Sequence, residues 1–309
     1  MNIIYQGRTK KIEKGLTVKE ALKKEINENK YEVIGCLYNN DYRNLETEVE
    51  EGARIELIDI SSKEGMKIYV RTIVYIMGKA FENLYNREKI MVEYQLGNAM
   101  YCKCDNIQIT DEFITKLKNE MQKIIEKDEK ITKVEMTRKE AEKFYEENNS
   151  SRGRLQFDLK GNKPIYMYYC GNYYNYCYGT LANRTGIIKI FDVIKYGDGF
   201  LIRYPSSKEP TKMPEFHETK KLAWALEEFE KIHSVLDVLT VYKLNKAIEE
   251  DRIKDVIMLA EALHEKKIAN IADDIAKRKN VKMVLFYYSN HQRNQKRQNK
   301  YREKKTKVL

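Results

Sequence analysis

The sequence predicts an α+β fold with more than one domain, on three observations. Its 309 residues are 42% hydrophobic and 34% charged, which is typical of a globular chain long enough for two domains. Short apolar stretches of strand character lie within the first sixty residues and again between residues 164 and 204. Apolar residues at helical spacing lie between these regions and dominate the chain after Pro214.

The first sixty residues predict strands around one helix. The expected strands are residues 2–5, 31–34, 36–38 and 54–60. A capping box of Thr17 and Glu20 begins the helix, which runs to about Ile26, and residues 39–41 form a polar turn. Strands on both sides of one helix predict a ubiquitin-like β-grasp domain over residues 1–62, with a generic small α+β domain as the alternative.

A second domain is expected over residues 63–225. A helix begins near Gly65, another begins near Thr110, and a capping box at Thr137 and Glu140 begins a third. The expected strands are residues 91–104, 164–170, 186–195 and 199–204. Residues 148–154 are expected to form a loop.

The end of the chain predicts helices followed by a basic segment. Residues 226–281 are expected to form a helical connector, and residues 281–286 look like the start of a buried strand. Residues 282–309 are expected to form a disordered basic tail. Eight basic residues and one acidic residue among the last twenty account for seven of the ten net positive charges. The body of the chain is therefore not a basic nucleic-acid binder by composition.

Composition also excludes several classes of function. All fourteen glycines lie at or before Gly199, and no GxxxxGK[ST] sequence occurs, so the chain has no P-loop for nucleotide phosphates. No apolar run reaches the ~18 residues of a membrane span and no signal sequence is evident, so a cytoplasmic location without a membrane is expected. The five cysteines are expected to be reduced thiols.

Four stretches resemble domains of one enzyme family. EGARIELI at residues 51–58 resembles the TGS domain, the β-grasp module at the front of threonyl-tRNA synthetase. Three others resemble the second additional domain of that synthetase, a two-layer α/β sandwich that hydrolyses mischarged seryl-tRNA. These are GMKIYVR at residues 65–71, GNYYNYCYG at residues 171–179 and TGIIKIF at residues 185–191. The resemblance covers about three quarters of the chain.

The same pair of domains also precedes the P-loop domain of uridine-kinase-like nucleoside kinases, where a strand similar to residues 281–285 leads into the ATP-binding loop. This resemblance implies a non-catalytic, ligand-binding or regulatory N-terminal region of such a kinase, truncated before its kinase domain. The alternative is a stand-alone tRNA- or RNA-binding module related to threonyl-tRNA synthetase, with the basic tail as an electrostatic anchor. Whether the chain is an enzyme stays open at this point, and the absent P-loop favours a non-enzyme.

The resemblance also implies a degenerate pocket. The editing site of the synthetase uses a His-x3-His pair on the first helix and a Cys-x3-His pair downstream, because imidazoles bind metal or move protons near neutral pH. Matched residue by residue, these positions are Arg71, Tyr75, Cys177 and Leu181 in this chain. Arginine stays protonated and leucine has no polar atom. Neither an editing hydrolase nor a zinc site is therefore expected.

No other metal, cofactor or catalytic site is expected. The spacings of Cys102 with Cys104 and of Cys170 with Cys177 differ from the C-x2-C pairs of structural zinc sites. The four histidines are isolated from one another in the sequence, and no nucleophile with a neighbouring base can be identified.

Seven tyrosines lie within thirteen residues, between Tyr166 and Tyr178. One interpretation is a platform on which nucleobases stack, with nearby cations holding phosphate. Its candidate residues are Tyr173, Tyr174, Tyr176, Arg184 and Lys189. The alternative is a tyrosine-rich pair of strands whose rings pack across the sheet. The pocket could then hold a nucleoside, an amino acid or the end of a tRNA-like RNA without chemistry.

Overall fold

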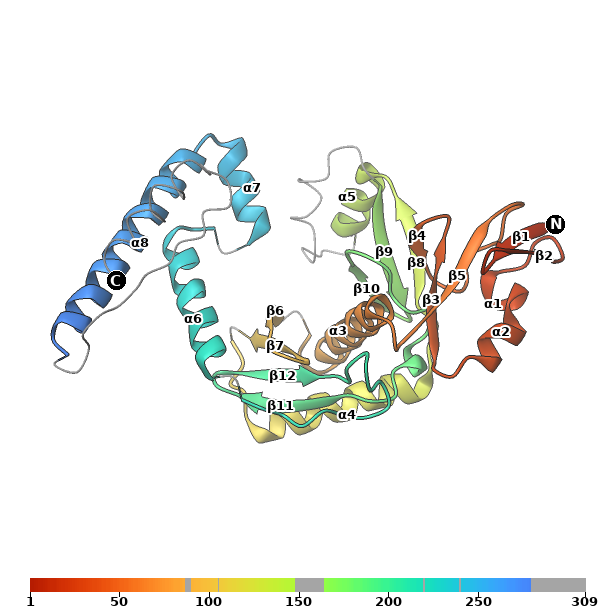
Figure 1. Cartoon of the computed structure of the whole chain (residues 1–309), viewed down its shortest axis with the longest axis horizontal. Helices are drawn as coiled ribbons and strands as arrows, with labels where there is room; N and C mark the ends of the chain where they lie inside the picture. The colour runs from red at the N-terminus through yellow and green to blue at the C-terminus, as the bar shows by residue number, and fades with distance from the viewer. Residues whose placement is uncertain (87–89, 105, 148–163, 219, 239, 279–309) are drawn as a thin grey trace, which may run out of the picture. The chain divides into compact units, whose positions relative to one another are not determined.

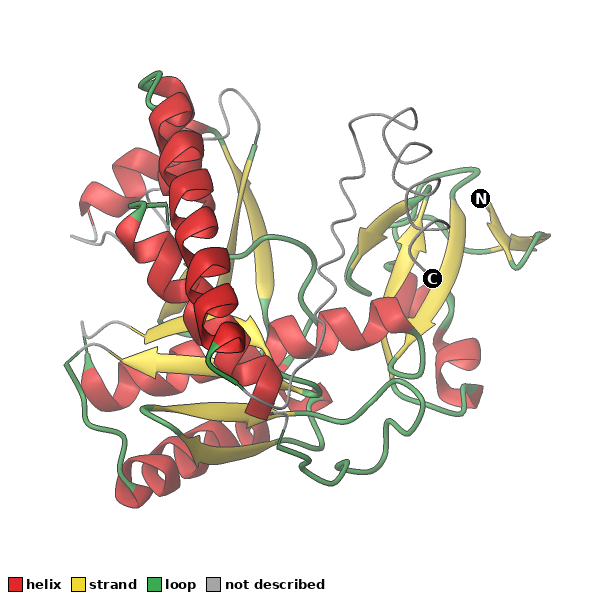
Figure 2. Ribbon diagram, turned by 60° about the vertical axis from the view of Figure 1, so that its left-hand side comes forward, coloured by secondary structure: helices red, strands yellow, loops and turns green. Residues whose placement is uncertain are grey.

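The computed structural model describes residues 1–86, 90–104, 106–147, 164–218, 220–238 and 240–278. The predicted α+β class is confirmed, since helices alternate along the chain with sheets whose strand pairs are mostly antiparallel (Figures 1 and 2). The chain divides into two compact units, Met1–Lys246 and the residues from Ala247 onward, which are described separately. The predicted strand at residues 281–286 and the predicted tail lie outside the described residues.

The N-terminal sheet has five strands in the order β2-β1-β5-β3-β4. These are β1 (Asn2–Tyr5), β2 (Arg8–Lys11), β3 (Val33–Tyr38), β4 (Asp41–Arg43) and β5 (Arg54–Asp59). Strand β1 pairs in parallel with β5, and the other pairs are antiparallel. This order is compatible with a β-grasp, which remains a prediction for this part of the chain.

The helical part of the N-terminal sheet domain begins as the sequence predicts. The Thr17 hydroxyl accepts from the Glu20 backbone N–H, and the Glu20 carboxylate accepts from the Thr17 N–H at 2.8 Å, which completes the capping box. The helix breaks at Leu22, so it consists of α1 (Val18–Ala21) and α2 (Lys23–Glu28). Leu22 itself is fully buried against the sheet.

The next part of the first unit contains two further sheets and three helices. The four-stranded sheet, in the order β11-β12-β7-β6, contains β6 (Ile90–Gln95), β7 (Ala99–Cys104), β11 (Asp192–Tyr196) and β12 (Gly199–Arg203). The three-stranded sheet, in the order β10-β9-β8, contains β8 (Thr132–Met136), β9 (Ile165–Cys170) and β10 (Tyr173–Tyr176). The helices are α3 (Lys63–Tyr85), α4 (Asp111–Lys127) and α5 (Arg138–Glu147).

Helix α3 lies between the two sheets and contributes to both of their cores. On one side, Ile73 and Phe81 pack with α4 and with Phe200 of the four-stranded sheet. On the other side, Tyr75 packs against Tyr168 of the three-stranded sheet. Helix α5 covers the opposite face of that sheet (Figure 1). A helix with apolar residues around most of its circumference is expected to be buried in this way.

Several sequence predictions differ from the structure. The two strands expected at residues 31–34 and 36–38 are one strand, β3, with an irregular register between Val33 and Gly35. Part of the strand expected at residues 186–195 is instead a short 3-10 helix, Thr185–Ile187, before β11 begins. Strands β2, β4 and β8 are not in the prediction, because their charged and polar residues give little apolar alternation.

The helices expected after Pro214 are present in the described residues. They are α6 (Lys220–Val235), α7 (Val241–Glu249) and α8 (Ile253–Ala276). Ala223 of α6 packs against Leu201 on the outer face of the four-stranded sheet, and Lys103 forms an ion pair with Glu230 at 2.8 Å. Within the described residues, no helix is long and apolar enough to cross a membrane.

Candidate functional site

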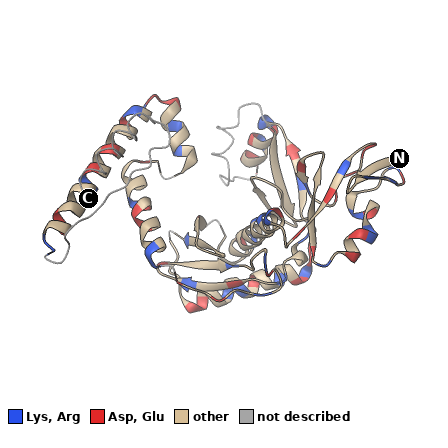
Figure 3. Ribbon diagram, in the orientation of Figure 1, with Lys and Arg blue, Asp and Glu red and all other residues tan. Residues whose placement is uncertain are grey.

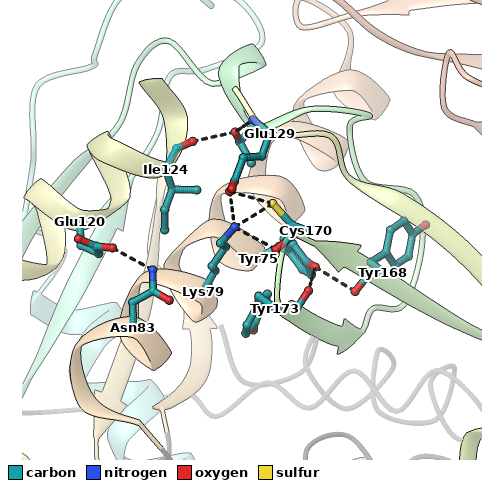
Figure 4. Close-up of polar contacts among 10 residues, drawn as sticks. Tyr75, Lys79, Asn83, Glu120, Ile124, Glu129, Tyr168, Cys170 and Tyr173 are labelled. Atoms are coloured by element: carbon teal, nitrogen blue, oxygen red, sulfur yellow. Dashed lines mark hydrogen bonds and ion pairs between the residues drawn. The ribbon is translucent and has the colours of Figure 1, made fainter. Parts of the chain in front are cut away.

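The candidate site lies where α3 faces the three-stranded sheet. Arg71, Tyr75, Lys79 and Asn83 follow one another at intervals of four residues and therefore share one face of α3. Figure 4 shows Tyr75, Lys79 and Asn83 of this face. The Ser62 hydroxyl accepts from the Gly65 N–H at 2.9 Å, which fixes where the helix begins. This start places the polar face of α3 toward strands β9 and β10.

The structure brings together the four positions that the resemblance identifies. Tyr75 and Leu181 belong to one buried cluster, and Cys177 packs against it. The Arg71 guanidinium lies against Gly179, where a Cβ atom would be only 2.9 Å from Arg71 Cζ. Gly179 also has a φ of +95°, so glycine is required here both for the backbone and for the close approach of arginine.

Arg71 is a half-buried cation without a counterion. Within the described part of the chain, its guanidinium has no hydrogen bond and no ion pair, although it is near the Cys177 thiol and Tyr168. A guanidinium has five N–H donors arranged to hold carboxylate or phosphate groups. This side chain can therefore bind an anion that enters from solvent.

Tyr75 has a structural role. It occupies the position at which the resemblance would place the second histidine of the His-x3-His pair. It is 2% exposed, and its hydroxyl donates to the Tyr168 carbonyl at 2.9 Å. Its ring contacts the Tyr173 ring edge to face, with the centroids 5.0 Å apart (Figure 4). Because its proton is held by a backbone carbonyl, Tyr75 is not placed to accept a proton from a substrate or water.

Burial keeps the Cys177 thiol neutral. It raises the pKa of Cys177 to about 12, and the nearby Arg71 charge lowers it only in part. The thiolate is the nucleophilic and metal-binding form, so this thiol is inert near neutral pH. Leu181 is fully buried and offers no polar atom. The four positions therefore provide a cation and an apolar floor, but no nucleophile and no base.

A buried polar cluster next to these positions is absent from the sequence prediction. The Lys79 ammonium forms an ion pair with Glu129 and donates to the Cys170 carbonyl at 2.9 Å, with the Cys170 sulfur at 3.4 Å (Figure 4). Lys79 is only 7% exposed. The contact holds the pKa of Glu129 below its usual range, whereas burial raises the pKa of the Cys170 thiol. The four-residue spacing from Tyr75 is the signal that could have identified Lys79.

The candidate tyrosines are divided between the two faces of the three-stranded sheet. Tyr173 is buried on the α3 face, beside Tyr75. Tyr176 is buried on the opposite face, in the cluster beneath α5, and Tyr174 packs against that cluster, with its ring 4.7 Å from the Phe144 ring. These three rings do not form one continuous exposed platform, and the most exposed tyrosine of the segment is Tyr178, at 78%.

The two candidate cations of the tyrosine segment lie elsewhere. Arg184 forms an ion pair with Asp128, which ends α4 in a left-handed conformation. Lys189 has an exposed side chain, and its backbone N–H donates to the Tyr69 hydroxyl at 3.1 Å. Tyr69 belongs to the cluster on the other side of α3, so the structure does not bring Arg184 or Lys189 to the Tyr75 cluster.

None of the side-chain groups in the described residues forms a metal centre. No cluster of three or more histidine, cysteine, aspartate or glutamate side chains is present there. All five cysteines are free thiols, and Cys36, Cys102 and Cys170 are buried.

Comparison with known proteins relates this chain to one kind of ligase, although no protein-family model matches it. A threonine–tRNA ligase of Caldanaerobacter subterraneus is 26% identical over 199 residues, which are 64% of this chain and 31% of the relative. A probable cytoplasmic threonine–tRNA ligase of Enterocytozoon bieneusi is 28% identical over 200 residues, 62% of this chain and 30% of the relative. The ligase of Thermotoga maritima is 25% identical over 198 residues, 63% of this chain and 30% of the relative.

The chain thus spans somewhat less than a third of the length of these relatives. About two thirds of the chain is a region similar to threonine–tRNA ligases.

Proposed function

We propose that this chain binds tRNA or a tRNA-like RNA through the region similar to threonine–tRNA ligases, and that it does not hydrolyse the bound ligand. The unpaired guanidinium of Arg71 carries the proposal. A cation held between a helix and a glycine turn, without an acceptor among the described residues, suits a phosphate or a carboxylate of a ligand. The names of the relatives, threonine–tRNA ligases, support tRNA as the proposed ligand.

The chemistry of the pocket supports binding without catalysis. Ester hydrolysis needs a group that accepts a proton from water or a group that attacks the ester. Arg71 cannot accept a proton, Tyr75 donates to a carbonyl, and Cys177 has a pKa of about 12. The pocket therefore has the means to hold an anion but lacks the groups that would activate water.

The relatives also favour this proposal over the kinase interpretation. Those reported above are tRNA ligases, and none of their names refers to a nucleoside or to ATP. The strand-like segment on which the kinase resemblance depends lies outside the described residues. A regulatory role in a nucleoside kinase therefore has no supporting observation, and we do not propose it.

Titration calorimetry of the full chain with tRNA, threonine, uridine and ATP tests the proposal. We expect heat of binding with tRNA, and a loss of affinity of about ten- to a hundredfold in Arg71→Met, because a charge-assisted contact contributes about 1.5–3 kcal/mol. Arg138→Met is the matched control, since Arg138 lies on the surface helix α5 and pairs with Glu142. Binding of uridine or ATP but not of tRNA would contradict the proposal, as would equal affinities in the two variants.

A further inference from the structure

A second basic site lies at the seam between the N-terminal sheet and the three-stranded sheet. The groove has a volume of about 300 Å³ and lies within the first compact unit. It is bordered by β4 and the residues after it, by β8 and the residues before it, and by Thr180. Pockets of this size hold small polar ligands or one unit of a larger one.

Lys133 is the most unusual residue of this groove. Its ammonium lies 3.7 Å from the centre of the Tyr166 ring, which gives a cation–π contact. No carboxylate lies within ion-pair distance of it among the residues that the structure describes. Burial and the neighbouring charge of Arg43 lower its pKa, while Asp41 and Glu135 compensate only in part. A half-buried ammonium in this position lacks an anion.

The charges around the groove are unbalanced. Arg43, Lys130 and Lys133 line it, whereas Glu46 is its only carboxylate. Lys130 forms an ion pair with Glu46 at 3.8 Å, and Arg43 forms one with Asp41 at 2.8 Å. Lys133 is therefore the groove cation that has no carboxylate within ion-pair distance among the described residues. Thr132 and Thr180 add hydroxyl groups to the wall.

Another surface hollow shows that this imbalance is specific. The hollow beside α1 and α2 has a larger volume, about 600 Å³. Its charged residues are three lysines and three glutamates, and Figure 3 shows both signs along these helices. Charges there neutralise one another, which leaves no reason to expect an anionic ligand. Of these two hollows, only the groove contains a half-buried cation, Lys133, that has no carboxylate within ion-pair distance among the described residues.

The groove is also directly connected to the candidate site. The Thr180 hydroxyl donates to the Tyr42 carbonyl at 2.8 Å, and the next residue, Leu181, belongs to the buried cluster of Tyr75 in the candidate site. Lys133 is paired with Tyr168 in the β-ladder, and the Tyr168 carbonyl accepts from Tyr75. An RNA strand whose end reaches Arg71 would therefore have its phosphate backbone within reach of this groove.

We propose that the groove formed by Arg43, Lys130, Lys133 and Thr180 binds a phosphate group, carried by an RNA strand whose end occupies the Arg71 pocket or by a free nucleotide. The RNA source rests on the proposed function, whereas phosphate binding does not. Arginine and lysine close together, with threonine hydroxyls beside them, form the donor set that holds phosphate oxygens.

Two variants of the full chain test the groove. Lys133→Met removes the charge and keeps the length of the side chain. Lys143→Met is the matched control, because Lys143 is an exposed residue of α5, on the opposite face of the same sheet. Neutralising an unpaired, half-buried ammonium is expected to leave the fold intact, which circular dichroism verifies. Lys133→Gln replaces the first variant if it fails to fold.

The first measurement is the anisotropy of labelled tRNA at several salt concentrations. The loss of one phosphate contact lowers the steepness of the plot of log K for tRNA binding against log salt concentration by about 0.9. This corresponds to roughly eightfold weaker tRNA binding at ~0.1 M salt. We expect this change in Lys133→Met and no change in Lys143→Met. If the wild type binds tRNA and the two variants have the same slope and affinity, the groove proposal is wrong.

The second measurement separates this proposal from the proposed function. Pyrophosphate, used as a free phosphate probe, is expected to raise the Tm of the wild type and of Lys143→Met, but not of Lys133→Met. This pattern without any tRNA binding would support the groove and contradict the proposed function. The groove proposal is wrong if pyrophosphate raises the Tm of all three proteins equally. It is also wrong if pyrophosphate shifts none of the three Tm values and tRNA binding does not depend on Lys133.

Discussion

At the scale of single residues, the buried Lys79 is the most demanding feature of the molecule. Its ammonium is almost completely removed from water and is compensated by Glu129 and by the Cys170 carbonyl. Glu129 is more accessible, with 31% of its side chain exposed. Removing Glu129 is therefore expected to change the stability of the protein by a different amount than removing Lys79.

We predict that Glu129→Gln destabilises the protein more than Lys79→Met. The first change leaves a buried cation without its counterion and is expected to cost about 2–3 kcal/mol. The second leaves a carboxylate that water can reach, and it is expected to cost about 1 kcal/mol. Urea unfolding at pH 7 measures both, with Glu142→Gln in the exposed pair with Arg138 as the control. Equal costs for the two changes would show that the burial of Lys79 is not what makes the pair important.

The difference between wild type and Glu129→Gln is also expected to depend on pH. The Lys79 contact holds the folded-state pKa of Glu129 below its ordinary value of 4.5, so the wild type gains stability from this carboxylate above that pH. The gain is lost as the pH falls through the lowered folded-state pKa. The difference in unfolding free energy between wild type and Glu129→Gln is therefore largest near neutral pH and becomes smaller below about pH 4.5.

The sequence predicted part of the site at this scale. The four-residue spacing of Arg71 and Tyr75 puts both on one face of α3, and Tyr75 packs in one cluster with Leu181, whereas a degenerate pocket at these positions stays a prediction. The same spacing extends to Lys79, but its partner Glu129 is fifty residues away in the sequence, and no local pattern reveals such a contact. The tyrosines were grouped by proximity in sequence, whereas alternation along β9 and β10 divides them between two faces.

At the scale of elements, the start of α3 is fixed by its contact with the end of β5. Gly65 packs so closely that a Cβ atom at this position would lie 1.9 Å from the Asp59 carbonyl oxygen. That carbonyl also accepts from the Ser62 hydroxyl at 2.8 Å, within the turn that begins the helix. Backbone atoms on both sides leave the turn little freedom to adjust.

We predict that Gly65→Ala destabilises the protein by about 2–3 kcal/mol, because the clash is with backbone and exceeds the gain in helix propensity. Gly78→Ala, further along the same helix, is the control. Its Cβ would meet the Tyr173 hydroxyl at 2.4 Å, which is a side-chain atom and not backbone, so a smaller cost is expected. Thermal unfolding of both variants measures the difference. A Gly65→Ala protein as stable as Gly78→Ala would contradict this description of the helix start.

Helix starts were more predictable from sequence than strands. The capping boxes at Thr17 and Thr137 and the acidic first turn after Thr110 all mark the beginnings of helices in the structure. These signals depend on residues three apart and are complete within one turn. Strand β8 depends instead on pairing with β9, which begins at Ile165, so its sequence, TKVEM, carries little local information. Strand β2 forms a hairpin with β1, but its sequence, RTKK, has no apolar residue to mark it.

At the scale of the whole molecule, the N-terminal sheet contacts the loop that carries Gly179 and Leu181 of the candidate site. Thr180 and Asn183 are buried polar residues of that loop, and they donate to the Tyr42 carbonyl and to Glu46. The backbone N–H of Ala182, between them, donates to the Thr72 hydroxyl of α3. The loop is thus held from two sides, which provides a rigid floor for a ligand. Composition could not predict this contact, and the predicted domain boundaries remain to be tested.

The central claim is that the pocket around Arg71 binds its ligand without hydrolysing it. The most direct test is the rate of deacylation of seryl-tRNA by the full chain, at protein concentrations that saturate tRNA binding. We expect the rate to equal that of the protein-free reaction at every concentration. A rate that rises with protein concentration and falls in Arg71→Met or Cys177→Ser, but not in Arg138→Met, would contradict the claim.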